Sequence, residues 1–191
     1  MQSNGRLHLA IIVGSTRVGR FAPTVASWFT GVAQSRGDLI VDVIDLAEAH
    51  LPDVLGGRSI PDRPAISARL AMADAFVVVT PEYNHSFPAP LKAAIDWHSQ
   101  EWRAKPVGFV SYGGRSGGVR AVEQLRQIFA ELHSTTVRNA VSFHDAWSQF
   151  DSDGQPTARD RYEAAANSML DQLVWWGEAL QEAKAKRPYP F

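Results

Sequence analysis

Short apolar runs alternate with amphipathic stretches along this chain. Residues 7–13 and 75–80 are apolar almost throughout, and a third run at 105–111 is largely apolar. Runs of this length without strict alternation are typical of strands buried on both faces, as in parallel sheets. The segment 39–46 is also strand-like, but Asp42 in its middle predicts a strand nearer the edge of the sheet.

Amphipathic stretches fill the intervals between these runs. Over residues 21–36 and 118–133, apolar positions recur at spacings of three and four, which is the period of a helix with one buried face. Further helices are predicted at 69–75, from Leu91 to about Trp102 and at roughly 158–184, with a fifth strand within 135–143. Strands separated by helices predict an α/β fold in three layers, a parallel sheet with helices on both faces. Five strands fit the sheet order 2-1-3-4-5.

Composition bounds the class of protein. The 191 residues contain no linker or repeat, so we expect one domain, residues 1–191, with the last helix packed on it. The net charge of −1 gives no electrostatic case for binding nucleic acid or an anionic membrane. The absence of cysteine excludes disulfides and thiol chemistry, so electron transfer would need a bound cofactor. With no apolar leader at the N-terminus, we expect a cytoplasmic protein.

The residues after the first apolar run favour an anion site. Gly14 allows a sharp turn, and Ser15 and Thr16 carry hydroxyl groups. Arg17 and Arg20 follow, with forked donors that match phosphate oxygens. The next helix begins there, with free N–H groups and the positive end of its dipole. A simpler interpretation is a plain helix start with the arginines on the surface.

Two further loops are expected beside the first one. In the order 2-1-3-4-5, the strands that precede residues 14–20, 81–87 and 111–118 are neighbours, so these loops converge on one crevice. The second loop is a rigid turn in which Tyr83 offers a flat face. The third has four glycines in residues 111–118, which let a flat ligand approach the backbone. A phosphate at one end and a flat ring at the other describe a mononucleotide, and flavin mononucleotide (FMN) suits that description.

Four pieces of the chain resemble the NADPH-dependent FMN reductases of flavodoxin-like fold, a family that includes chromate, quinone and azo-dye reductases. They are Gly14-Ser15-Thr16-Arg17, Thr80-Pro81-Glu82-Tyr83-Asn84, the helix segment Leu91–Trp97, and Ser111-Tyr112-Gly113-Gly114 with Gly117-Gly118. The resemblance spans about residues 6–143. It implies a flavodoxin-like three-layer sandwich, FMN as cofactor and NADPH or NADH as co-substrate. It also implies a homodimer or homotetramer.

The resemblance carries roles to individual positions. It implies that the first loop holds the FMN phosphate through Ser15, Arg17 and Arg20, although many relatives have a serine where Arg20 stands. It implies that residues 81–84 line the ribityl chain and the isoalloxazine, and that the 111–114 segment closes the other side. The candidate cofactor-binding residues are Ser15, Thr16, Arg17, Gly19, Arg20, Pro81, Glu82, Tyr83, Asn84, Ser111, Tyr112, Gly113 and Gly114.

The predicted function is an FMN-dependent NAD(P)H oxidoreductase. By ping-pong hydride transfer it would reduce a small acceptor, such as a quinone, a metal oxyanion, an azo compound or free flavin. The chemistry resides on the flavin, so no catalytic side chain is required. His85 is a candidate proton donor, but a surface role is the favoured interpretation. No histidines have metal-ligand spacing.

Two other functions remain open. One is a dinucleotide-binding protein of the Rossmann type that binds NADP without flavin, with Asp45 as the ribose acid. Its glycine pattern is wrong, because no second glycine follows Gly14 at two residues. The other is a non-catalytic, flavodoxin-like electron carrier, for which a net charge of −1 is unusually weak.

Overall fold

A computed structural model describes residues 5–51 and 65–191 of the chain. Its centre is a parallel sheet of six strands in the order β2-β1-β3-β4-β5, with β6 also paired to β4. The strands are β1 (Leu7–Val13), β2 (Leu39–Asp45), β3 (Ala75–Pro81), β4 (Pro106–Tyr112), β5 (Thr135–Thr136) and β6 (Val141–Phe143). The predicted sheet order is confirmed, and β2 lies at the edge as Asp42 indicates.

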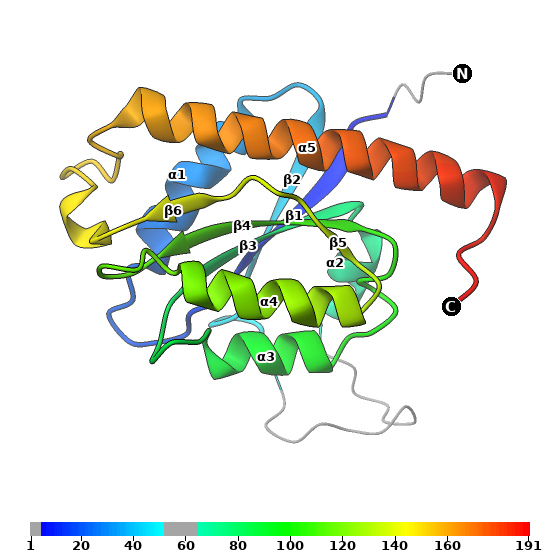
Figure 1. Cartoon of the computed structure of the whole chain (residues 1–191), viewed down its shortest axis with the longest axis horizontal. Coiled ribbons are helices and arrows are strands. Elements are labelled where there is room, and N and C mark those ends of the chain that lie inside the picture. Colours follow the sequence, from blue (N-terminus) through cyan, green and yellow to red (C-terminus); the bar gives the residue numbers. More distant parts are fainter. Residues whose placement is uncertain (1–4, 52–64) are drawn as a thin grey trace.

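Helices cover both faces of this sheet, which confirms the three-layer α/β architecture. Figure 1 shows α5 and α1 on one side of the strands and α2, α3 and α4 on the other. The helices are α1 (Ala22–Gln34), α2 (Ser67–Met72), α3 (Ala89–Asp96), α4 (Val119–Glu131) and α5 (Arg159–Lys186), with a short 3-10 turn η1 (Ala146–Ser148).

The two faces of the sheet carry separate hydrophobic cores. All seven residues of β3 and of β4 are buried, because helices cover them on both sides. Side chains alternate across a strand, so Val77 and Val79 join the core beneath α1 and α5, whereas Phe76 and Val78 join the core beneath α3 and α4. The continuous apolar pattern of these strands is therefore explained by two-sided burial.

The fifth predicted strand is divided in two. Thr135–Thr136 pairs with Pro106–Val107, and Val141–Phe143 pairs with Val110–Tyr112. The four intervening residues, 137–140, face only residues 108 and 109 of β4, so they bulge from the ladder. The backbone N–H of Asn139 donates instead to Oε1 of Gln172 on α5, at 3.0 Å.

Helix α3 ends earlier than its sequence pattern predicts, at Asp96 rather than near Trp102. Side chains from the following turn take its last carbonyl groups. The indole of Trp102 donates to the carbonyl oxygen of Ile95 at 3.2 Å, and Nδ1 of His98 lies 2.7 Å from that of Ala94. These bonds replace the next turn of helix.

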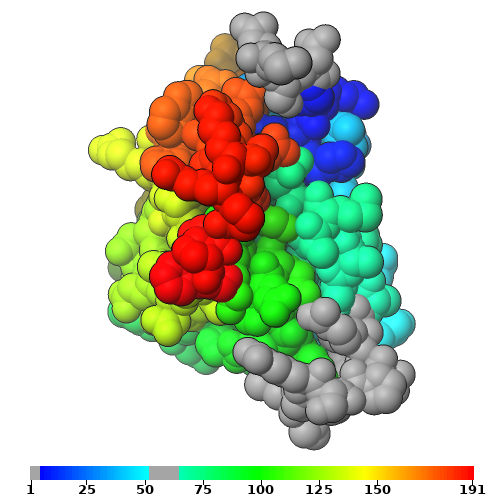
Figure 2. All heavy atoms as spheres, turned by 90° about the vertical axis from the view of Figure 1, so that its right-hand side faces the viewer, coloured from blue at the N-terminus to red at the C-terminus, as the bar shows by residue number. Residues whose placement is uncertain are grey.

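The end of the sheet opposite to the carboxyl ends of the strands carries the C-terminal tail. Figure 2 shows this tail lying across the end of α4. The ring of His133 stacks on Phe191, with centroids 5.5 Å apart, and its Nδ1 lies 2.9 Å from the hydroxyl of Tyr189. Among the described residues, no helix is long and apolar enough to cross a membrane. Three prolines and the pair Gly56-Gly57 predict a long surface loop over residues 47–66, and most of this segment lies outside the described residues.

Candidate functional site

The three predicted loops meet at the carboxyl ends of β1, β3 and β4. Figure 1 shows them together at the left of the sheet. The N–H of Gly14 donates to the carbonyl of Val79 at 2.9 Å, and the N–H of Glu82 donates to that of Tyr112 at 3.2 Å. Parallel strands deliver their carboxyl ends to one edge, where open α/β sheets bind ligands. The structure thus brings the candidate residues of all three loops together.

In the first loop, only part of the chain faces solvent. Ser15 is fully buried, and its hydroxyl lies 2.8 Å from that of Tyr83, which joins the first and second loops. Thr16, Arg17 and Gly19 are exposed. Gly19 has a φ of +67°, a conformation in which a side chain would be strained. The exposed residues therefore lie between a rigid buried serine and the start of α1.

Helix α1 begins without a side-chain cap. Phe21 occupies the N-cap position, makes no side-chain hydrogen bond to the helix, and no acidic residue stands in the first turn. Pro23 lacks an N–H, but the other N–H groups of the first turn still need acceptors. With the positive end of the helix dipole, they favour an anion at this position.

Arg20 is bound to the protein itself. Its guanidinium forms a two-pronged ion pair with the carboxylate of Asp45, with N–O distances of 2.5 and 2.6 Å, and also donates to the carbonyl of Ser15 at 2.6 Å. The hydrogen bond to Asp45 raises the pKa of Arg20 above its ordinary value, against an opposing effect of burial. Asp45 also accepts the N–H of Ala47 at 3.0 Å. The predicted phosphate contact of Arg20 stays a prediction, now with these competing partners.

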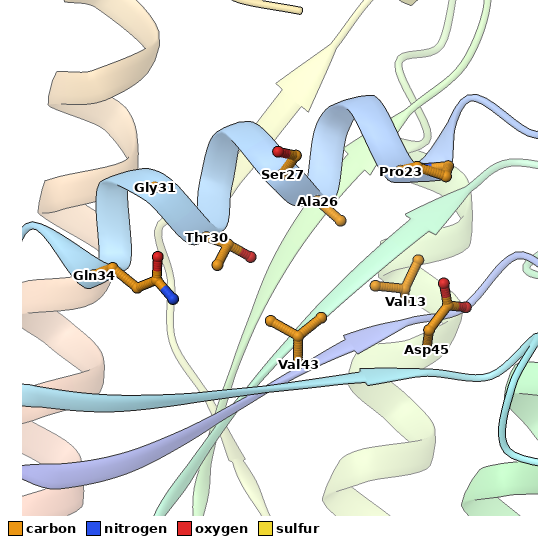
Figure 3. Close-up of a pocket in the computed structure, with 9 residues that line it drawn as sticks. All are labelled: Val13, Pro23, Ala26, Ser27, Thr30, Gly31, Gln34, Val43 and Asp45. Atoms are coloured by element: carbon orange, nitrogen blue, oxygen red, sulfur yellow. The ribbon is translucent and has the colours of Figure 1, made fainter.

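A groove of about 470 Å³ runs between α1 and the edge strand β2 and ends at Asp45. Figure 3 shows Asp45 and Val13 facing Pro23 at one end of it, and Gln34 at the other. Because Arg20 pairs with Asp45, it links the first loop to the end of β2 next to this groove.

The second loop is a tight hairpin. Tyr83 and Ser86 exchange both backbone hydrogen bonds, at 2.8 and 3.0 Å, and the two residues between them have φ values of +49° (Asn84) and +72° (His85). Two positive φ values in a two-residue turn are typical of type I′. A histidine there carries backbone strain of about 1–3 kcal/mol, which the surroundings must hold. The exposed His85 also has its Nδ1 3.2 Å from a guanidinium nitrogen of Arg120.

The second loop docks on the first turns of α4. Gln124 accepts the hydroxyl of Ser86 at 2.6 Å and donates to the carbonyl of His85 at 2.9 Å. Nothing local in the sequence marks Arg120 or Gln124, since each lies more than thirty residues from its partner. Their spacing of four on an exposed helix face is the one available signal.

Glu82 joins the second loop to the third. Its side chain is 5% exposed; it forms an ion pair with Arg120 and accepts the hydroxyl of Ser116 at 2.8 Å. It also accepts the backbone N–H of Arg120 at 3.3 Å, so it caps α4 from a different loop. Burial acts to raise its pKa, but the hydrogen bonds from Ser116 and Arg120 outweigh it and hold the pKa below the ordinary value.

The glycines of the third loop serve two different needs. Gly117 and Gly118 have φ values of +59° and +85°, and a Cβ on either would lie 2.5–2.7 Å from the side chains of Ser142 or Ser111. The hydroxyl of Ser111 donates to the carbonyl of Gly117 in the same loop, at 2.7 Å. By contrast, a Cβ on Gly114 would meet nothing within 4 Å. The later pair is therefore required by packing, and the earlier glycine leaves open space beside the crevice.

Tyr112 ends β4 with its phenol turned toward the first loop. The side chain is 4% exposed, its ring packs edge-on against Phe21 at 6.2 Å, and its hydroxyl has no hydrogen-bond partner among the described residues. Burial raises the pKa of this phenol and Tyr83 adds to the rise, whereas the nearby hydroxyl of Ser15 and the charge of Arg20 oppose it. A buried donor with no acceptor is costly unless a ligand provides one.

These features fit FMN. The uncapped helix start, the hydroxyl of Ser15 and the unpartnered phenol of Tyr112 suit a phosphate, and the open space beside Gly114 suits a flat ring. The described residues contain no group of three or more His, Cys, Asp and Glu side chains placed to hold a metal ion.

Comparison with known proteins identifies the family. Residues 7–148 match the NADPH-dependent FMN reductases. The chain belongs to this family. It is 33% identical over 126 residues to an NAD(P)H-dependent FMN reductase of Schizosaccharomyces pombe, a match covering 58% of this chain and 60% of the relative. It is 34% identical over 159 residues to the probable NADPH:quinone oxidoreductase 1 of Oryza sativa subsp. japonica, covering 78% and 81%.

A solved structure shares the fold. The flavoenzyme NAD(P)H:(acceptor) oxidoreductase FerB from Paracoccus denitrificans superposes with a TM-score of 0.69 at 22% identity, over 91% of this chain and 98% of that one. The family match confirms the predicted enzyme class, an oxidoreductase that uses FMN and NAD(P)H. The flavodoxin-like fold is confirmed by the sheet order and by this superposition.

Proposed function

We propose that this chain oxidises NAD(P)H and delivers the electrons, through bound FMN, to a small-molecule acceptor at the same site. When bound, FMN supplies the redox chemistry, taking a hydride from the nicotinamide and passing two electrons to the acceptor. Both half-reactions share one open crevice, which supports a ping-pong order. The observation that carries the proposal is the convergence of three loops on a buried serine, an uncapped helix start and an unpartnered phenol.

The residues of this site bind and orient the cofactor. Ser15, Thr16, Arg17 and Gly19, with the start of α1, form the phosphate end. The turn of the second loop and the backbone of Gly113 and Gly114 flank the ring, with open space beside Gly114. Backbone N–H groups aimed at a ring that gains negative charge stabilise its reduced form. Glu82 holds the second and third loops at a constant separation and is not required to move a proton.

Quinones, azo compounds, metal oxyanions and free flavin are the proposed acceptors. The name of the rice relative supports quinones, and the exposure of Thr16, Arg17 and Gly19 at the site supports access for a broad range of acceptors. We further propose that the whole chain acts as a single FMN-binding unit and that it works as a homodimer or homotetramer.

The visible spectrum of the purified protein tests this function. Protein supplied with FMN should carry a flavin absorption band that bleaches under nitrogen when NADPH or NADH is added and returns with a quinone. Colourless protein that does not take up FMN would overturn the proposal. Flavin that stays oxidised in the presence of either nucleotide would favour the electron carrier.

A protein that binds NADP without flavin is the other alternative. It would use Asp45 as an acceptor for a ribose hydroxyl. In the structure, both carboxylate oxygens of Asp45 are bound by Arg20. Tight NADPH binding by protein that takes up no FMN would restore this alternative.

A further inference from the structure

The start of α1 needs an anion, and the first loop supplies fewer donors for it than its sequence indicates. The helix has no side-chain cap and no acidic residue in its first turn. Arg20, the basic residue closest to this start, donates two hydrogen bonds to Asp45 and one to the carbonyl of Ser15. Its charge is therefore compensated within the protein, and its fork is directed at the end of β2.

A different residue has an unused donor at this place. Tyr112 lies at the end of β4, and its ring touches Phe21, the N-cap residue of α1. Its hydroxyl is buried and has no hydrogen-bond partner among the described residues. Ser15, Tyr83 and Arg20 lie near enough to affect its pKa. Two independent features, an uncapped helix start and an orphaned buried hydroxyl, thus point to one anion.

We propose that the hydroxyl of Tyr112 is a buried hydrogen-bond donor to the phosphate of FMN, and that Arg20 is a brace that positions the loop rather than a phosphate ligand. This inference rests on the proposed function for the identity of the anion. The phenol approaches the phosphate from the β4 side of the crevice, whereas Ser15 and the helix N–H groups approach from the first loop. A phosphate monoester is the ligand class that satisfies all of these donors together.

Burial supports this role physically. A phenol is already protonated at neutral pH, and burial raises the pKa of Tyr112 further, so its hydroxyl is available as a donor. A hydrogen bond to a charged acceptor is about twice as strong as one between neutral groups, and it gains further strength in a poorly solvated site. The same donor would give little to riboflavin, which lacks the phosphate.

Paired titrations with FMN and riboflavin test the inference. Flavin-free wild-type protein and Tyr112→Phe are titrated with each flavin by fluorescence quenching. The phenylalanine keeps the ring against Phe21 and removes only the hydroxyl. We expect the dissociation constant for FMN to rise about tenfold or more in the variant, and that for riboflavin to change less than about twofold. Equal losses for both flavins, or no loss for FMN, would overturn the inference.

Tyr162→Phe is the matched control. Tyr162 is also a buried tyrosine, but its hydroxyl lies 3.2 Å from Oε1 of Gln149, outside the three loops. The Tyr162→Phe variant should leave the preference for FMN over riboflavin unchanged. If wild-type protein binds neither flavin, the proposed function is overturned. If wild-type protein binds FMN but prefers it over riboflavin no more strongly than Tyr112→Phe does, only the role of Tyr112 is overturned.

A second measurement serves if Tyr112→Phe does not fold. In Tyr83→Phe, Tyr112 is the one phenol left on the three loops, because the chain has four tyrosines and the others are on α5 and the tail. Inorganic phosphate is added while the ultraviolet difference spectrum is recorded. A red shift of the phenol band that saturates with phosphate supports donation by Tyr112, and an unchanged band at saturating phosphate overturns it.

Discussion

The two ends of the parallel sheet both bury polar side chains, but they satisfy them differently. At the amino end of β4, the ammonium of the buried Lys105 donates to the carbonyls of Leu70 and Ala71, both at 3.0 Å, and so caps α2. At the carboxyl end of the same strand, the phenol of Tyr112 is also buried but has no partner in the described part of the chain.

Positive φ values occur at both ends of the sheet: at the amino end, Ala104 has a φ of +50° and His133 one of +60°. The carboxyl end places Asn84, His85, Gly117 and Gly118 at positive φ, close to the crevice. The loops there are held by side chains from other loops, such as Glu82 on Ser116 and Ser15 on Tyr83. Strained backbone therefore occurs at both ends, and the carboxyl end differs in having a buried phenol without an internal partner. At this edge of the sheet, the buried phenol without an internal partner marks the ligand site more specifically than polarity alone does.

The largest expected effect is that of a methyl group at Gly118. Gly118→Ala would place its Cβ 2.7 Å from that of Ser111 at a φ of +85°. We expect a loss of about 3 kcal/mol in the free energy of unfolding, from strain and overpacking together, and loss of FMN binding. Urea unfolding and flavin titration measure both.

Gly31→Ala is the control for that substitution. Gly31 lies inside α1, and a Cβ there meets nothing within 4 Å. It should stabilise the protein by about 0.5–1 kcal/mol. Equal stabilities of the two variants would show that the third loop tolerates a shift that its packing does not suggest.

The second prediction concerns Lys105, at the amino end of β4. Burial lowers the pKa of Lys105 to about 8 in the folded protein, against the ordinary 10.5 of the unfolded chain. Between these pH values the unfolded state binds more protons, so the free energy of unfolding should rise with pH. The rise relative to Lys105→Met, which cannot titrate, should reach up to about 3 kcal/mol.

Unfolding of both proteins in urea at several pH values from 7 to 10 measures this difference. The variant should leave FMN affinity unchanged, because Lys105 lies at the opposite end of β4 from the site. A difference between the two proteins that stays constant across this range would contradict the pKa of Lys105. A weakened flavin affinity would instead show that the two ends of the sheet are coupled.

The third prediction tests the link between the second and third loops. Glu82→Gln keeps the shape of the side chain and removes the charge that pairs with Arg120. We expect the variant to be less stable by about 1–2 kcal/mol at pH 7. Since the folded pKa of Glu82 is lowered, the stability it provides is present above the unfolded pKa and is lost as pH falls through the folded one. The two proteins should therefore converge in stability toward pH 3.

Glu123→Gln, on the same helix, is the control. Glu123 is exposed and lies 3.7 Å from Arg126, so its loss should cost less than about 0.5 kcal/mol. A gap for Glu82→Gln that persists at acid pH would mean that the amide disturbs packing rather than charge.

The smallest effect distinguishes a brace from a ligand at Arg20. Asp45→Asn weakens the ion pair with Arg20. As a brace, Arg20 would then hold the loop less well, and the dissociation constant for FMN should rise about three- to tenfold. An arginine released to bind phosphate would tighten FMN binding instead. Asp42→Asn, on the same strand and paired with the exposed Arg69, should change nothing in the flavin titration.

Several features were predictable because their signals are local. The apolar runs of β1, β3 and β4 are continuous, since two-sided burial removes any alternation, and helix spacing identifies α1 and α4. The three loops follow these strands, so their convergence follows from the sheet order. By contrast, the division of the last strand depends on the contact of Asn139 with Gln172. The early end of α3 depends on the contact of Trp102 with Ile95. No window of sequence contains the first pair.

The parallel sheet, the three loops at its carboxyl edge and the kind of ligand they suit can all be predicted from the amino-acid sequence. Strand burial and turn chemistry are written in neighbouring residues. The use of the donors in these loops depends on contacts between distant residues: Arg20 pairs with Asp45, 25 residues away, and the hydroxyl of Tyr112, near the start of α1, has no partner among the described residues. The residue type of a hydrogen-bond donor does not show whether it has a partner, because the partner can come from any part of the chain that folding brings close to it.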